Sequence, residues 1–324
     1  MGKTMKPKKA AWKETISSLV PAIETVVVFF IICLFNGNFA SAKNIQSVLV
    51  SAAPMIVMAS AYTFVILTGS VDLSNGTLLT LTCVITAFTF PQYGNLCLLM
   101  GIAVGAIAGF INGSLIVVFK MPAFIVTLCT QQIWKCIALV ICGGASHSIP
   151  KSAWGALNWT TTTVLGVPLM FWGAIAFWLI LVFIQKYTTI GRKIFAIGAN
   201  EKAARMMGVQ IKSTRYAAYI ISDIGAGIAG YLYALRLKSS SATLGDSLNL
   251  LAISTVVLGG TWLSGGHGSV TRTMPAALTV MMLQTALKVV RLDAYYQDIT
   301  FGLILIIAIM INSDHDRSNT TAIV

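Results

Sequence analysis

YTTIGRKIFAIGANEKAARMMGVQIKSTR, residues 187–215, is the longest polar interruption in a sequence that is otherwise mostly apolar. Its charged residues are mostly basic: Arg192, Lys193, Lys202, Arg205, Lys212 and Arg215, with Lys186 just before the stretch. Against them stands a single acid, Glu201. Long apolar segments lie on both sides, so this stretch is predicted to be a cytoplasmic loop between membrane-spanning helices.

The composition is typical of a membrane protein. Of the 324 residues, 56% are hydrophobic and only 10% are charged, and the mean hydropathy is +0.83. Water-soluble domains carry about 25% charged residues, and several apolar runs approach the ~20 residues that a helix needs to cross the hydrocarbon. The sequence lacks the alternating segments of about ten residues that build membrane barrels. The predicted fold class is therefore all-α, a polytopic transmembrane helical bundle.

About ten spans are predicted within one transmembrane domain, residues 19–312. The segments are 19–35, 46–68, 73–90, 96–119, 123–142, 164–184, 216–235, 248–263, 270–289 and 299–311. Residues 1–18 are predicted to form a basic cytoplasmic segment, 185–215 the long cytoplasmic loop and 313–324 a cytoplasmic tail. An even number of spans places both termini on one side of the membrane.

The distribution of Lys and Arg agrees with this topology. The cytoplasmic side receives the five lysines before residue 14, Lys120, the 187–215 loop, Arg272 and Arg317. The other side receives Lys43, Lys151, Lys238 and the mixed turn 291–298. Such a bias sets the orientation of membrane proteins. The formal net charge of +12 is therefore attributed to the loops that orient the protein in the membrane, and no nucleic-acid partner is predicted.

Two nucleotide-binding patterns occur in the wrong context. Residues 225–230 fit G-x-G-x-x-G but lie within an apolar helical segment, which favours helix packing over dinucleotide binding. Residues 263–266 spell LSGG, the start of the ATP-binding-cassette (ABC) signature, yet the sequence contains no G-x-x-x-x-G-K-[ST] phosphate loop. We therefore predict no enzyme activity and no cofactor in this chain, with ATP used by a partner subunit.

Histidines and cysteines do not predict a metal site. The three histidines lie in predicted loops without spaced partners, and the six cysteines lie in or beside apolar segments without a C-x-x-C pair.

The fourth span contains a regular glycine pattern: Gly101, Gly105, Gly109 and Gly113 recur every four residues. That spacing places them on one helical face, where another helix can approach closely.

Polar residues at membrane depth predict a candidate transport path, because they are costly to bury there. Asp72, Ser74 and Asn75 open the third predicted span, and Asp246 and Asn249 repeat the D-x-x-N spacing at the eighth. The recurrence hints at an internal repeat in which the starts of broken helices line the path. The alternative for Asp72 is a simple helix cap.

The fifth span adds Gln131, Gln132 and Lys135 to this candidate path. Lys135 follows Gln131 by four residues, so the two side chains lie on one helical face. They either face a water-filled cavity or hydrogen-bond to neighbouring helices. Asp223 and Gln284 are predicted to form interhelical hydrogen bonds.

Four stretches carry a family likeness: TGSVDLSNG at 68–76, PAFIVTL at 122–128, GRKIFAIGAN at 191–200 with its continuation to 209, and LGGTWLSGGHGS at 258–269. Together they resemble the permeases of bacterial sugar ABC importers of the ribose, galactose and xylose type. The likeness extends from about residue 45 to residue 312.

The resemblance implies a multi-pass permease of the bacterial inner membrane that moves a monosaccharide or similar small polar solute inward by alternating access. It also implies the partners: a second permease copy or paralogue, two ABC ATPase subunits and a periplasmic substrate-binding protein. ATP-driven closure would reach the permease through a short cytoplasmic coupling helix, for which residues 201–207 are the candidate.

The expected ATPase-coupling residues are Asn200, Glu201, Ala203, Ala204, Arg205 and Gly208. The asparagine can cap the helix, and the glutamate in its first turn suits the helix dipole. The two alanines permit close docking, and the glycine is placed to end the helix.

The sequence departs from the family pattern at two places, and the change in the fifth span is expected to alter the substrate contacts. Lys135-Cys136 stands where many relatives have Arg-Gly, and His267 stands where Arg is common. Taken alone, the 187–215 loop also resembles branched-chain amino-acid ABC permeases, which is one alternative. The other is a self-sufficient, ion-coupled secondary transporter that uses Asp72, Lys135 and Asp223 as a relay.

Overall fold

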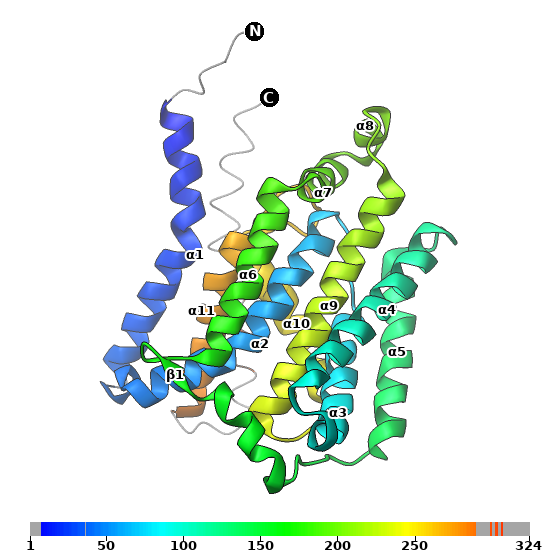
Figure 1. The fold of residues 1–324 in the computed structure, drawn as a ribbon. Coiled ribbons are helices and arrows are strands. Elements are labelled where there is room, and N and C mark those ends of the chain that lie inside the picture. Colours follow the sequence, from blue (N-terminus) through cyan, green and yellow to red (C-terminus); the bar gives the residue numbers. More distant parts are fainter. Residues whose placement is uncertain (1–7, 36, 290–298, 300–301, 304–305, 307–324) are drawn as a thin grey trace.

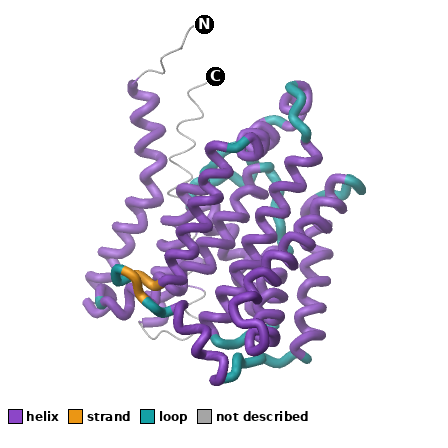
Figure 2. Tube along the Cα trace, in the orientation of Figure 1, coloured by secondary structure: helices purple, strands orange, loops and turns teal. Residues whose placement is uncertain are grey.

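The computed structural model describes residues 8–35, 37–289, 299, 302–303 and 306 as an almost entirely helical molecule (Figures 1 and 2). The helices are α1 (Lys8–Phe35), α2 (Ala42–Leu67), α3 (Asn75–Tyr93), α4 (Cys97–Val117), α5 (Ala123–Cys142), α6 (Leu169–Tyr187), α7 (Thr189–Ala199), α8 (Glu201–Met206), α9 (Ile211–Leu237), α10 (Leu244–Leu258) and α11 (Val270–Val289). Short 3-10 helices cover Gly37–Ala40, Gly94–Leu96 and Lys151–Thr160. The all-α prediction is confirmed.

Five helical stretches in the described part of the chain are long and apolar enough to cross a membrane. They are Ala42–Leu67, Asn75–Val117, Ala123–Cys142, Leu169–Tyr187 and Ile211–Leu237, the second of which contains both α3 and α4. Shorter apolar helices cover Leu19–Phe35 and Leu244–Leu258. Most of the predicted tenth segment, 299–311, lies outside the described residues, as do residues 1–7 and the predicted tail.

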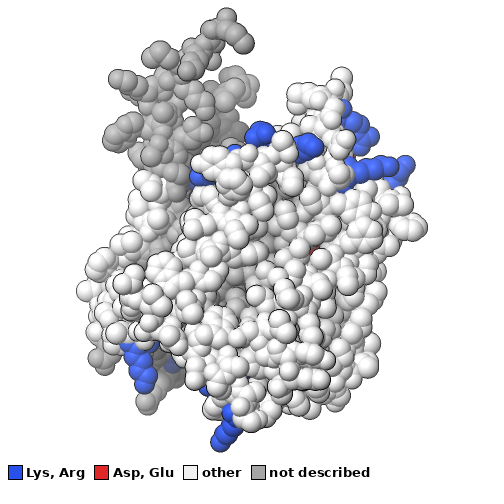
Figure 3. Space-filling model, viewed as in Figure 1, with Lys and Arg blue, Asp and Glu red and all other residues white. Residues whose placement is uncertain are grey.

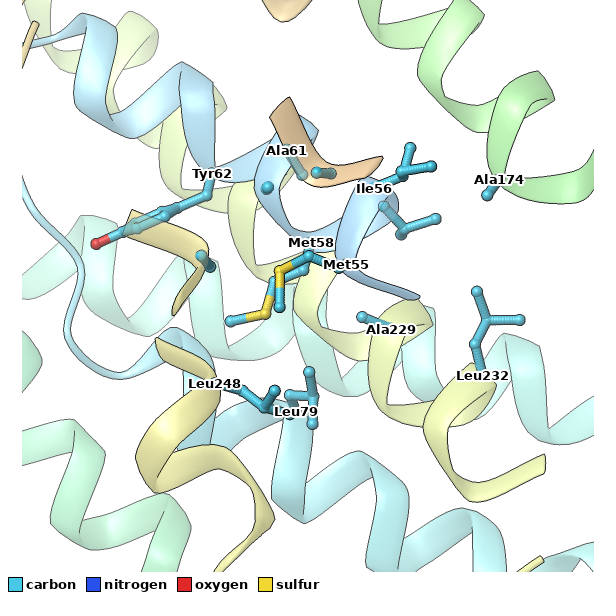
Figure 4. Close-up of a cluster of buried hydrophobic side chains, with 14 of the residues drawn as sticks. Met55, Ile56, Met58, Ala61, Tyr62, Leu79, Ala174, Ala229, Leu232 and Leu248 are labelled. Carbon is cyan, nitrogen blue, oxygen red and sulfur yellow. The ribbon is translucent and has the colours of Figure 1, made fainter. Parts of the chain in front are cut away.

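Helix α2 forms the centre of the bundle. Every residue from Ser51 to Leu67 is buried, so this part of the helix has no face left for lipid, and α6, α9 and α11 pack around α2. Figure 4 shows Met55 and Met58 of α2 pointing toward Leu79 of α3 and Leu248 of α10. A helix that is apolar on all sides belongs in such a position.

Helices α4 and α9 approach each other closely along the predicted glycine face. A Cβ atom on Gly101 would lie 2.8 Å from the carbonyl oxygen of Gly227, and one on Gly109 would lie 2.6 Å from Cα of Ile220. Gly227 belongs to the G-x-G-x-x-G pattern, whose first and last glycines pack against α2 and α3. Both glycine patterns therefore serve helix packing, as predicted.

Helix α6 begins five residues later than predicted. Residues 163–168 form a small antiparallel hairpin, β1 (Thr163–Val164) and β2 (Val167–Pro168). Leu165 and Gly166 form its turn with φ values of 55° and 79°, the left-handed backbone that two-residue hairpin turns require. The predicted start at Val164 was wrong because an apolar run does not reveal this turn.

Two further boundaries differ from the sequence prediction. Helix α10 covers Leu244–Leu258 instead of 248–263. It ends earlier than predicted because Gly260, in the glycine-rich loop 259–269, adopts a positive φ of 76°. The predicted loop 185–215 is mostly helical: it contains α7, α8, the last turn of α6 and the first turn of α9. The sequence predicts helix in this loop only at residues 201–207.

Candidate transport path and coupling helix

The chain leaves helical geometry between α2 and α3, in the segment that contains Asp72. Gly69 has a positive φ of 74°, and α3 does not begin until Asn75. The hydroxyl of Tyr62 donates to the carbonyl oxygen of Asp72 at 2.8 Å and accepts from its N–H at 3.0 Å. Figure 4 shows this hydroxyl pointing away from the other labelled core side chains. One tyrosine thus satisfies both backbone groups of Asp72.

The Asp72 side chain is fully buried and shapes this break locally. Its Oδ1 accepts from the backbone N–H of Ser74 at 2.8 Å and from the Ser74 hydroxyl at 2.6 Å. This is a local turn in which the aspartate bonds two residues ahead. Asp72 does not cap the first turn of α3: Ser74 holds the cap position and makes no side-chain cap bond.

Asp72 belongs to a buried polar network, which we call the Asp72–Asp223 network. The amide of Asn75 donates to Asp223 Oδ1 at 3.2 Å, and the amide of Asn112 donates to Asp223 Oδ2 at 3.1 Å and to Ser74 Oγ at 3.0 Å. The carboxyl groups of Asp72 and Asp223 also interact directly with one another. All five residues are fully buried, so the network joins α3, α4 and α9 instead of facing an open path.

The starts of α3 and α10 meet, which brings the two D-x-x-N stretches together. The Asn249 amide donates to the carbonyl oxygen of Leu73 at 2.9 Å, and the N–H of Gly245 donates to the Thr80 hydroxyl at 2.8 Å. A Cβ atom on Gly245 would collide with the backbone of Gly76. The glycines allow this approach because they have no side chain.

Lys135 and Asp246 form an ion pair beside this junction. Lys135 Nζ on α5 lies 2.7 Å from Asp246 Oδ2 on α10, and the side chains are 31% and 40% exposed. Gln131 is half-buried and Gln132 is exposed. Of the eight residues expected to line a path, the pair and the two glutamines reach the surface, whereas the other four are buried.

A basic cavity of about 1250 Å³ opens near α8. Its walls come from the break at 69–71, the α4–α5 turn and the residues around the start of α9. Its charged lining residues are Lys120, Arg205, Lys212 and Arg215, together with Glu201. The carboxylate of Glu201 binds Arg205 at 3.1 Å and Arg215 at 2.6 Å, which ties α8 to the first turn of α9.

Helix α8 has the caps that its sequence predicts. The side chain of Asn200 accepts from the N–H of Ala203 at 3.0 Å, Glu201 lies in the first turn, and Gly208 follows the helix with a positive φ of 81°. Ala204 is fully buried among Ile197 and Ile211 of the same chain. Its small side chain therefore serves internal packing and is not available for docking.

The outward surface of α8 contains two residues that the sequence reasoning missed. Met206 is 89% exposed and Met207 is 74% exposed, and exposed Ala203 lies one turn before Met207. Their signal in the sequence is two adjacent methionines within an otherwise basic stretch. Figure 3 shows Lys and Arg side chains gathered at this end of the molecule, with fewer at the opposite end.

The sequence from residue 44 to residue 309 matches the family described as "Branched-chain amino acid transport system / permease component". The chain belongs to this family. The match includes the break, the junction of α3 and α10, and α8, so all of these features belong to a transport permease component.

Among the relatives of this permease is the ribose import permease protein RbsC of Haemophilus influenzae, 32% identical over 89% of this chain and 90% of the relative. RbsC of Bacillus subtilis is 31% identical over 94% of this chain and 95% of the relative. The L-arabinose transport system permease protein AraH of Escherichia coli K12 is 29% identical over 91% of this chain and 90% of the relative. No solved structure matches the permease.

Proposed function

We propose that this chain is the membrane-spanning permease subunit of an ABC importer that moves a monosaccharide or similar small polar solute into the cell. The observation that carries the proposal is the family match over residues 44–309. The relatives named for ribose and L-arabinose support sugar over branched-chain amino acids as the cargo class.

The proposed topology has ten spans with both termini in the cytoplasm of a bacterium, across its inner membrane. Residues 19–312 form the transmembrane domain, with 1–18 and 313–324 as cytoplasmic ends. Support comes from the basic side chains around α7, α8 and the start of α9, because Lys and Arg favour the cytoplasmic side (Figure 3). The β1–β2 hairpin lies toward the opposite end (Figure 1), which is proposed to face the periplasm and a substrate-binding protein.

The proposed transport path runs along the surface that carries Lys135 and Asp246. A partly exposed ion pair is costly against lipid, so a second permease copy or a paralogue is proposed to cover this surface and enclose a polar passage. Gln131 and Gln132 add hydrogen-bonding groups suited to a hydroxyl-rich solute. Asp72, Ser74, Asn75 and Asn249 are proposed to fix the helix starts that border the passage.

Helix α8 is proposed to be the coupling helix that receives force from a separate ABC ATPase. Its exposed Met206 and Met207 form an adaptable apolar contact for the ATPase, and the bond of Glu201 to Arg215 on α9 transmits movement of α8 to α9. ATP would be used by that partner. Closure of the ATPase would then alternate the access of the passage between the two sides of the membrane.

Reconstitution into liposomes tests the proposal. The permease together with its proposed ATPase and binding-protein partners should take up sugar only with ATP, and an ATPase variant lacking the phosphate-loop lysine should abolish uptake. The permease alone should take up nothing under a proton or sodium gradient. Gradient-driven uptake by the permease alone would instead establish an ion-coupled carrier.

A further inference from the structure

Asp72 and Asp223 place two carboxyl groups in contact at a fully buried position halfway along α9. The donors that reach them are the N–H and hydroxyl of Ser74 and the amides of Asn75 and Asn112. All four donors are neutral. This arrangement is independent of the identity of the cargo.

Two ionised carboxylates do not fit this environment. Two adjacent negative charges repel strongly at the low effective dielectric constant of a buried site, and each buried ion also loses its hydration. The neighbouring titratable groups are Tyr62 on α2 and Tyr219 on α9, phenols that carry no charge at neutral pH. Arg215, two turns before Asp223 on α9, already pairs with Glu201 at 2.6 Å.

The hydrogen bonds leave one acceptor of this pair without a donor. Oδ1 of Asp72 accepts two bonds from Ser74, and each oxygen of Asp223 accepts one amide. Oδ2 of Asp72 is buried and receives no donor from the described side chains or backbone. A proton between this oxygen and the Asp223 carboxyl group supplies the missing donor, as in other carboxyl pairs that share a site.

We infer that Asp72 and Asp223 bind one shared proton, which fastens the non-helical segment 68–74 to the middle of α9. The proton is a resident ligand of the fold, held between side chains from two elements that are far apart in the sequence. Its removal leaves two adjacent buried negative charges. The folded permease is therefore expected to lose stability at alkaline pH.

Infrared spectroscopy of the purified permease in lipid nanodiscs tests this inference. At neutral pH the protein should show the C=O stretch of a protonated carboxylic acid, and carbon-13 labelling of aspartate should shift the band. The band should be lost in Asp72→Asn and in Asp223→Asn. It should persist in Glu24→Gln, the matched control that removes a carboxyl group within the apolar helix α1.

An aspartate band that is absent at neutral pH, or that survives both variants, would overturn the inference. A rise in melting temperature on adding Na⁺ or K⁺, without an acid band, would also overturn it, because the pair would then be ionised around a cation. If a variant does not fold, the labelled wild-type protein still reports on the band. Alkaline titration of that same sample should then remove the band and lower the melting temperature together.

Discussion

Lys135 Nζ on α5 lies 2.7 Å from Asp246 Oδ2 on α10, and this partly exposed ion pair links the two helices. Ion pairs exposed to water contribute about 0–1 kcal/mol. The importance of this pair therefore comes from its place on a surface that is mostly apolar, where an unpaired charge is costly.

Breaking the Lys135–Asp246 pair should impair transport more than it impairs folding. Lys135→Met leaves Asp246 unpaired, at a cost of up to about 3 kcal/mol at membrane depth, whereas the exchange Lys135→Asp with Asp246→Lys restores a neutral pair. We expect uptake in proteoliposomes to fall strongly in the single variant and to recover in part in the exchange. Lys151→Met, an exposed lysine outside the bundle, is the control. Equal uptake in all variants would show that the Lys135–Asp246 pair is not part of the transport path.

Charge on the tip of α8 should prevent association with the ATPase. Replacing Met206 and Met207 by Asp removes an apolar contact surface and adds two negative charges without touching the core, because both side chains are exposed. We expect loss of ATPase co-purification and of uptake, with an unchanged melting temperature.

The matched control for the Met206 and Met207 substitutions is Leu165→Asp. Leu165 is 90% exposed in the hairpin turn toward the other end of the molecule, and Asp tolerates its left-handed backbone. This variant should co-purify with the ATPase normally. Loss of association in the control as well would show that the α8 variant acts through a general defect.

The cap of α8 can be tested separately from its surface. Asn200→Ala removes the acceptor for the N–H of Ala203, and losing such a cap costs about 1 kcal/mol. Asn200→Asp keeps the acceptor and should behave like the wild type. Because α8 has only six residues, we expect faster amide exchange of α8 in the alanine variant and weaker ATPase stimulation. Unchanged exchange in α8 would show that the ion pairs of Glu201 suffice to hold it.

A side chain on the α4 glycine face should destabilise the bundle. In Gly109→Leu the first added atom would lie 2.6 Å from Cα of Ile220 and 2.8 Å from the carbonyl oxygen of Tyr219, and overpacking costs roughly 1–3 kcal/mol or more. Gly173→Leu on α6 is the control, because a Cβ atom added there would meet no neighbouring atom within 4 Å. We expect a lower melting temperature in the first variant alone.

The sequence was sufficient for the helices whose signals are local. α5 and α11 have the predicted bounds, because Pro122 precedes the first, a glycine-rich loop precedes the second, and each apolar run is continuous. The glycine contacts of α4 were also predictable, since a four-residue repeat has one geometric meaning. These features need no knowledge of distant parts of the chain.

The candidate site was less accessible, because it depends on pairings between distant residues. Lys135 and Asp246 were both expected on the path, but their pairing across 111 positions was not. Asp223 was expected to make an interhelical bond, yet nothing local indicates that its donors are Asn75 and Asn112 or that Asp72 lies beside it. Ala204 was expected at a docking surface; only the fold shows that Ile197 and Ile211 enclose it.

The contact between α4 and α9 has a mechanical consequence. Backbone meets backbone at Gly101 and Gly227, so no side chain there can change rotamer to absorb a displacement. Helices α4 and α9 should therefore move as one rigid body during a transport cycle. Relative sliding would then fall to α5 and α10, which are linked to each other by a breakable pair of charges.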